Sequence, residues 1–73
     1  MKRRDLLAHL AARGCVLLRE GARHSWWHNP VLNKRSAVPR HTEVNNHLAR
    51  KICRDLGVPE PERFQRGEQY GTD

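Results

Sequence analysis

Side chains that can do chemistry are concentrated in one short stretch of the sequence, residues 19–30. It holds two arginines, both tryptophans, two of the five histidines and a glycine. Histidine exchanges protons near neutral pH, arginine binds phosphate through several N–H donors, and aromatic rings stack on bases. Any chemistry in this stretch can therefore use charge, stacking and proton transfer together.

The charge of the chain also indicates an anionic partner. The formal net charge is +6, and residues 1–54 hold twelve of the 14 Lys and Arg residues but three of the eight acidic ones. Such a surface attracts nucleic acid or an acidic protein. A solvated basic surface without any ligand is the alternative.

The spacing of potential metal ligands does not favour a metal or redox site. Cys15 and Cys53 lie far apart without a Cys-x-x-Cys motif, so we expect two buried free thiols. His24 and His28 are four residues apart, which on a strand separates their ring nitrogens too far for one tetrahedral zinc ion. We expect no metal and no cofactor.

No segment is apolar over the length that a membrane span needs. The basic start, residues 1–4, resembles the head of a signal peptide, but Asp5 and His9 interrupt the apolar run that a signal peptide requires after it. These features predict a cytoplasmic protein.

The elements that must position residues 19–30 can be predicted from apolar spacing. Leucine and alanine at helical spacing predict a helix over residues 3–13, ended by Gly14, with Lys2, Arg3, Arg4 and Arg13 on its basic outer face. Short apolar or tryptophan-containing runs predict strands at 15–19, 23–28 and 34–38, with a turn at 20–22. A second helix is expected over 46–56, capped by Asn45 or Asn46 and by Gly57.

The predicted order is α-β-β-β-α. It indicates an α+β fold in which two helices cover one face of a three-stranded antiparallel sheet, and this resembles the double-stranded-RNA-binding fold. A chain of 73 residues forms one domain with a small core. We place that domain at residues 1–66, with Phe64 as a lid on the core and residues 67–73 as a flexible tail.

Strand alternation divides the predicted second strand between two faces. His24, Trp26 and His28 share one face, while Arg23, Ser25 and Trp27 share the other, so one tryptophan is buried. We favour Trp26, which would put His24 at the margin of the helix-covered face. If Trp27 is buried instead, His24 faces the open side of the sheet with Trp26 as a stacking platform.

A series of short motifs, in order along residues 1 to about 64, resembles the HicA (YcfA-like) toxin family. The motifs are Lys2-Arg3-Arg4-Asp5-Leu6-Leu7, Gly14-Cys15, Arg19-Glu20-Gly21, His24, Asn29-Pro30, Val38-Pro39-Arg40-His41 and Ile52-Cys53-Arg54-Asp55-Leu56-Gly57. Two positions depart from the family pattern. Ala22-Arg23 stands where the family often has Gly-Gly or Gly-Ser, and Asn46-His47 stands where it often has Gly-Thr.

The resemblance implies a type II toxin that cleaves mRNA, with a double-stranded-RNA-binding type of fold. Its single essential histidine, after the glycine turn, corresponds to His24. It also implies a HicB-type antitoxin that masks the site, so we expect a monomer when the toxin is free and a hetero-oligomer with the antitoxin.

Under this hypothesis each basic residue has a candidate role. His24 would activate a ribose 2′-hydroxyl, with Arg23 and Arg19 stabilising charge on the phosphoryl oxygens. Lys34, Arg35 and Arg40 would hold RNA phosphates, and His41 would orient the substrate or assist proton transfer. Two other readings stay open: a non-catalytic RNA-binding module, and a component that acts only through a protein partner.

Overall fold

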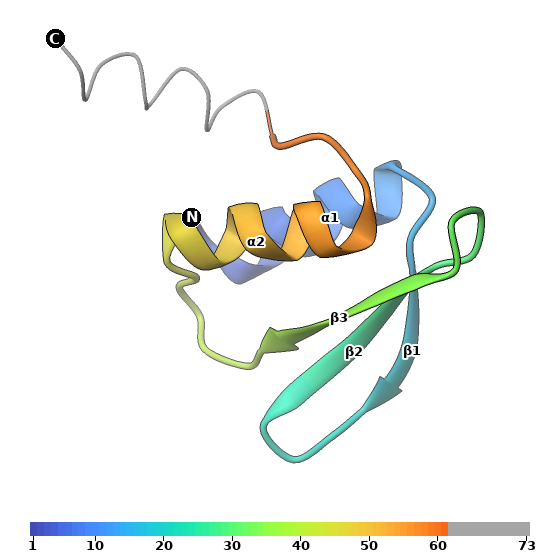
Figure 1. Ribbon diagram of the computed structural model, residues 1–73. Helices are drawn as coiled ribbons and strands as arrows, with labels where there is room; N and C mark the ends of the chain where they lie inside the picture. Colours follow the sequence, from blue (N-terminus) through green and yellow to red (C-terminus); the bar gives the residue numbers. More distant parts are fainter. Residues whose placement is uncertain (62–73) are drawn as a thin grey trace, which may run out of the picture.

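The computed structural model describes residues 1–61; the expected Phe64 lid and the tail at 67–73 lie outside the described residues. Five elements follow in the predicted order (Figure 1). They are α1 (Arg3–Ala12), β1 (Val16–Glu20), β2 (His24–Asn29), β3 (Lys34–Pro39) and α2 (Asn46–Leu56). The first two strands begin and end one residue later than predicted, and the second helix has the predicted bounds.

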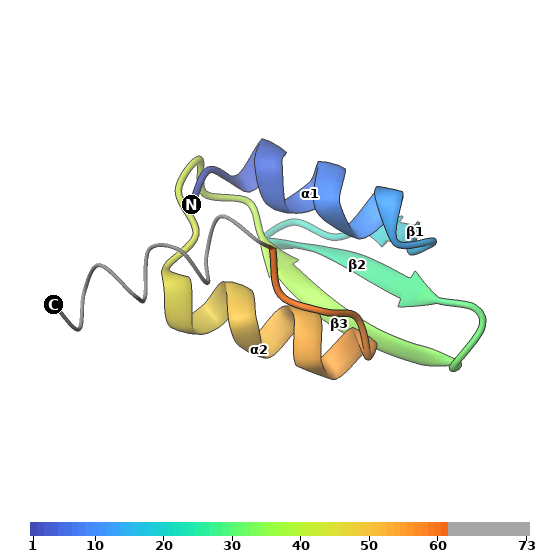
Figure 2. The same cartoon turned by 90° about the horizontal axis from the view of Figure 1, so that it is seen from above.

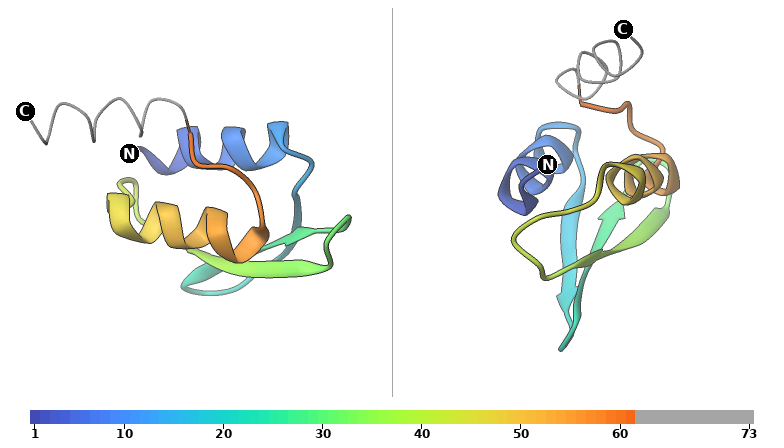
Figure 3. Two further views of the ribbon diagram at one scale, coloured as in Figure 1. Left: turned by 45° about the horizontal axis from the view of Figure 1, so that its top comes forward. Right: turned by 90° about the vertical axis from the view of Figure 1, so that its left-hand side faces the viewer.

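The strands form one antiparallel sheet in the order β1-β2-β3. Both helices lie side by side on the same face of this sheet, as the views in Figures 2 and 3 show. The predicted fold class, α+β with a three-stranded sheet covered on one face, is confirmed.

Local sequence signals account for the helix ends. Asn45 is the N-cap of α2, and its side-chain oxygen accepts a hydrogen bond of 2.8 Å from the backbone N–H of His47. Gly57 closes the same helix with φ of 71°, and Gly14 follows α1 with φ of 89°. Both angles lie in the left-handed region that glycine adopts without strain.

The hydrophobic core lies between the helices and the β2–β3 side of the sheet. α1 contributes Leu6 and Leu10, β3 contributes Val38, and α2 contributes a run of four buried residues: Ala49, Ile52, Cys53 and Leu56. By contrast, Val16, Leu17 and Leu18 of β1 are each nearly half exposed, at 48%, 47% and 46%. β1 is therefore an edge strand that the helices leave largely uncovered.

Both cysteines are buried free thiols, as predicted. Burial raises the pKa of each. For Cys53 the pKa rises from 9.0 to about 11, first through desolvation and then through the nearby charge of Glu60. The folded protein therefore keeps this thiol protonated where an unfolded chain would lose the proton.

We predict that this thiol makes the free energy of unfolding fall in alkaline solution. Its folded pKa is raised, so its contribution is intact below the unfolded pKa of 9.0 and is lost as pH rises toward about 11. The expected loss is about 2 kcal/mol. Urea unfolding at a series of pH values measures it, and Cys53→Ala, whatever its effect at neutral pH, should have a shallower alkaline slope. An identical slope in the variant would contradict the prediction.

Candidate functional site

The two tryptophans lie on opposite faces of β2. Trp27 packs against the core, and its neighbours on that face, Ser25 and Asn29, are buried. Ser25 pairs with Val38, a core residue, which fixes this face as the one under the helices. The expectation that Trp26 is buried is wrong, and the alternative holds: Trp26 and His24 share the open face of the sheet.

His24 is the first residue of β2, and its side chain is exposed. The preceding turn holds its backbone, because the N–H of Gly21 donates a 2.7 Å hydrogen bond to the His24 carbonyl oxygen. A Cβ on residue 21 would lie 3.0 Å from that oxygen, so the turn is built for glycine. On the other side His24 pairs with Pro39 of β3. The backbone is thus fixed while the imidazole stays accessible.

His24 lines a pocket of about 410 Å³. Four of the predicted site residues, from the β1–β2 turn and from the end of β3, line it: Arg23, His24, Arg40 and His41. Ala22 and Pro39 complete the lining. Two imidazoles and two guanidiniums therefore meet in one place, although they come from segments separated by the length of the β2–β3 hairpin.

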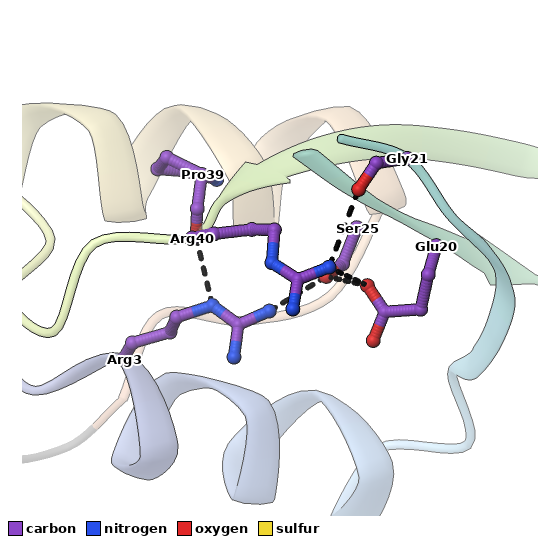
Figure 4. Close-up of polar contacts among 6 residues, drawn as sticks. All are labelled: Arg3, Glu20, Gly21, Ser25, Pro39 and Arg40. Carbon is purple, nitrogen blue, oxygen red and sulfur yellow. Dashed lines mark hydrogen bonds and ion pairs between the residues drawn. The ribbon is translucent and has the colours of Figure 1, made fainter. Parts of the chain in front are cut away.

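Arg40 is held in this pocket by the end of β1 (Figure 4). Its Nη1 lies 3.3 Å from the Glu20 Oε1 and donates to the Gly21 carbonyl oxygen at 3.2 Å. Both side chains of the ion pair are half exposed, so the pair contributes little stability by itself. Its effect is to orient Arg40 and to offset part of its charge.

Beneath the pocket, Arg3 of α1 joins the strand ends. Its Nε donates to the Pro39 carbonyl oxygen at 2.8 Å, and its Nη2 donates to the Ser25 Oγ at 2.6 Å. Ser25, which is fully buried, in turn donates to Glu20. We call these contacts of Arg3, Ser25, Glu20 and Arg40 the Arg3 network (Figure 4). The prediction that Arg3 lies on the basic outer face of the helix is wrong, because its side chain reaches the sheet.

Charge on this side of the molecule is mostly positive. Within residues 1–61, Arg23 is exposed and makes no ion pair or hydrogen bond through its side chain. A second pocket, of about 280 Å³, shares Arg40 with the first and is lined also by Lys2, Arg3, Arg4 and Thr42. A basic surface therefore runs from the imidazole of His24 to the start of α1.

Comparison with known families identifies the chain. A family model described as the HicA toxin of bacterial toxin-antitoxin systems matches residues 3–58, which span α1 through α2. The chain belongs to this family. Its members are toxins of toxin–antitoxin pairs, so an antitoxin partnership follows. Neither a curated protein nor a solved structure matches the chain.

The structure separates the toxin's remaining predicted residues from the pocket. Arg19 and Arg35 lie on the open face of the sheet, on either side of Trp26. Lys34 lies at the far end of β3, with its stem near Gly57 of the α2 cap, and its role in RNA binding stays a prediction.

His28 of the toxin is also apart from the pocket, at the far end of β2. Its Nε2 lies 3.1 Å from the Asn33 Oδ1. Over residues 1–61, no three His, Cys, Asp or Glu side chains are grouped so that they could hold a metal ion. No helix in that part of the toxin is long and apolar enough to cross a membrane.

Sequence reasoning missed Ser25 and Glu20 as site residues. A serine between histidine and tryptophan on a strand is a weak signal, but a small polar residue on the helix-covered face needs a hydrogen-bond partner. That requirement would have pointed to a nearby charged residue without saying which one.

We predict that Arg3→Ala lowers the free energy of unfolding by about 2 kcal/mol, because a charged hydrogen bond to the buried Ser25 is lost. Arg4→Ala is the matched control, since Arg4 is exposed on the same helix and should change stability by less than about 0.5 kcal/mol. Urea unfolding compares the two. Equal effects in both variants would show that the Arg3 network has no stabilising role.

Proposed function

We propose that the toxin is an endoribonuclease that cleaves mRNA without a metal ion, with His24 as the general base. The observation that carries this proposal is the pocket in which His24, His41, Arg23 and Arg40 meet. Proton transfer and neutralisation of phosphate charge are the two requirements of RNA cleavage by the ribose itself, and the pocket supplies both.

The proposed reaction is an internal transfer within the RNA strand. His24 removes the proton of a ribose 2′-hydroxyl, and the 2′-oxygen attacks the adjacent phosphorus. The P–O5′ bond breaks, leaving a 2′,3′-cyclic phosphate on one product and a 5′-hydroxyl on the other. His41 is the donor available in the same pocket to protonate the departing 5′-oxygen.

The two arginines take different parts in this scheme. Arg23 has no other partner in the described part of the chain, so its guanidinium can turn fully toward the phosphoryl oxygens. Arg40 is held by Glu20 and Gly21, so its guanidinium provides positive charge at a fixed position in the pocket. A planar guanidinium matches the geometry of phosphate oxygens.

The proposed antitoxin is of the HicB type and masks the His24 pocket. The pocket and the adjoining surface at the start of α1 are basic, so an acidic partner segment would bind there with favourable electrostatics. Such a partner and an RNA phosphate would compete for the same guanidinium groups, and binding of one would exclude the other.

One observation favours the alternative of a non-catalytic RNA-binding module. Within residues 1–61 the imidazole of His24 accepts and donates no hydrogen bond that would fix its orientation. A general base is usually oriented by a partner. In the leading proposal the substrate itself provides that contact, and the activity of a folded His24 variant decides between the two.

We predict that His24→Ala abolishes growth arrest and reduces cleavage of purified RNA by roughly 10²- to 10⁴-fold, the contribution of a positioned base. His28→Ala is the matched control, because His28 is on the same face of β2 but contacts Asn33, and should retain activity. Both assays use toxin shown to be folded by circular dichroism. Undiminished growth arrest with folded His24→Ala protein would refute the catalytic role of His24.

We predict that His41→Ala slows cleavage of ordinary RNA by about 10²-fold or more. The same variant should cleave RNA carrying a bridging sulfur in place of the 5′-oxygen at nearly the wild-type rate, since a thiolate leaves without being protonated. Rates on the two substrates are measured side by side by gel electrophoresis. An equal loss on both would assign His41 to binding rather than to proton donation.

A further inference from the structure

A second hollow lies on the open face of the sheet, away from the helices. Its volume is about 300 Å³, and it is lined by Leu18, Arg19, Trp26 and Arg35. The three strands each contribute: Arg19 pairs with Trp26 across β1–β2, and Trp26 pairs with Ala37 beside Arg35 on β3. We call these four residues the Trp26 groove.

A bulge in β1 builds one wall of the groove. The register between β1 and β2 shifts between Leu17 and Arg19. Side chains normally alternate between faces along a strand, but an extra residue interrupts the alternation. Leu18 and Arg19, although adjacent, can therefore both line the groove beside Trp26.

The Trp26 groove is basic and has no acidic residue in its lining. Arg19 and Arg35 are exposed, and neither makes an ion pair or hydrogen bond through its side chain in the described part of the chain. The nearest acid in sequence, Glu20, pairs with Ser25 on the opposite face and is engaged by Arg40. Two guanidiniums thus flank one indole without a counter-charge.

Trp26 is not needed in the hydrophobic core, because Trp27 packs there. A half-buried indole between two unpaired arginines combines the features of a single-stranded nucleic-acid site, in which a ring stacks on a base and cations bind the flanking phosphates. Such a ring can stack only on a base that is not enclosed in a duplex. The chemistry of the groove therefore fits an unpaired base.

The groove continues the surface on which His24 lies. His24 and Trp26 project from the same face of β2, two residues apart, which is about 7 Å along a strand. An RNA strand with its reacting phosphate at His24 would pass over Trp26 with a neighbouring nucleotide. The groove and His24 therefore lie on the same face of the sheet, within the reach of one RNA strand.

We propose that Trp26, Arg19 and Arg35 form a base-stacking subsite that selects single-stranded RNA and holds a nucleotide next to the cleaved bond. This inference rests on the proposed ribonuclease function for the identity of the substrate. It adds to that function a preference for unpaired RNA. The fold alone would not predict this preference.

Binding is tested apart from cleavage, in His24→Ala protein, with a short single-stranded RNA, its abasic counterpart and the same sequence as a duplex. We expect Trp26→Ala to weaken binding of the single strand by roughly tenfold, within the range that loss of one stacked base gives. Binding of the abasic strand and of the duplex should change by less than about twofold. His28→Ala, on the same face, is the control and should bind as the parent does.

Trp26→Phe keeps an aromatic ring and guards against a folding defect in the alanine variant. It should bind the single strand within about threefold of the parent, because a phenyl ring also stacks. RNA should quench the intrinsic fluorescence of protein that contains Trp26, and this quenching should vanish in Trp26→Phe, in which Trp27 is the remaining tryptophan.

Salt dependence tests the two arginines. Arg19→Ala and Arg35→Ala should each reduce the slope of log affinity against log salt by roughly 0.7, the value for one phosphate contact with a single strand. Trp26→Ala should leave that slope unchanged.

The proposal is overturned if folded Trp26→Ala protein binds single-stranded RNA as tightly as the parent. If that variant binds RNA normally but loses affinity for the antitoxin, the proposal is also overturned, because the groove would then be a binding site for the protein partner. Failure of the ribonuclease proposal is a separate result, seen as wild-type toxin that leaves RNA intact, whereas the stacking measurements use binding and fluorescence only.

Discussion

The Arg3 guanidinium is the contact on which the geometry of the pocket depends. In so small a domain the buried apolar residues lie under the β2–β3 side of the sheet, and Val38 extends that packing to the residue before Pro39. Arg3 adds hydrogen bonds to Pro39 and to the buried Ser25. These hydrogen bonds are directional, so they fix the positions of the strand ends more closely than apolar contacts would.

The same hydrogen bonds reinforce the meeting of two sequence segments at His24, which the β2–β3 pairing brings about. Pro39 pairs with His24 and accepts from Arg3, while Glu20 joins Ser25 to Arg40. The end of β3 is thereby held against the β1–β2 turn from two sides. The imidazoles and guanidiniums of the pocket are exposed, but the backbone beneath them is joined by strand pairing and shared hydrogen bonds.

Much of the fold was predictable because its signals are local. The second helix has the expected bounds because Asn45 and Gly57 mark both ends by their own backbone preferences. Which tryptophan is buried was not predictable, since a shift of one residue exchanges the two faces of a strand. The deciding fact is a long-range one, the pairing of Ser25 with core residue Val38.

The candidate site divides in the same way. Residue type and the family motif identified His24, Arg23, Arg40 and His41 one by one, and the register of β2 with β3 brings them together. The partners of Arg3 could not be predicted, because helical spacing says which side of a helix is apolar but not which polar group a long side chain reaches. Arg19 and Arg35 were expected near phosphate, yet the association of Arg19 with Trp26 depends on the β1 bulge, and that of Arg35 depends on the β2–β3 register.

The uncovered β1 edge has a consequence for the toxin when it stands alone. One side of this strand has no neighbouring strand within residues 1–61, and three consecutive aliphatic residues on it, Val16 to Leu18, are nearly half exposed. Unpaired backbone beside apolar side chains is a template for strand addition by another chain. The bulge between Leu17 and Arg19 and the charged end of β1 at Arg19 and Glu20 shorten that template but do not remove it. Free toxin should therefore self-associate through β1 as its concentration rises. Toxin that accumulates beyond the amount its partner can cover would be lost to this association.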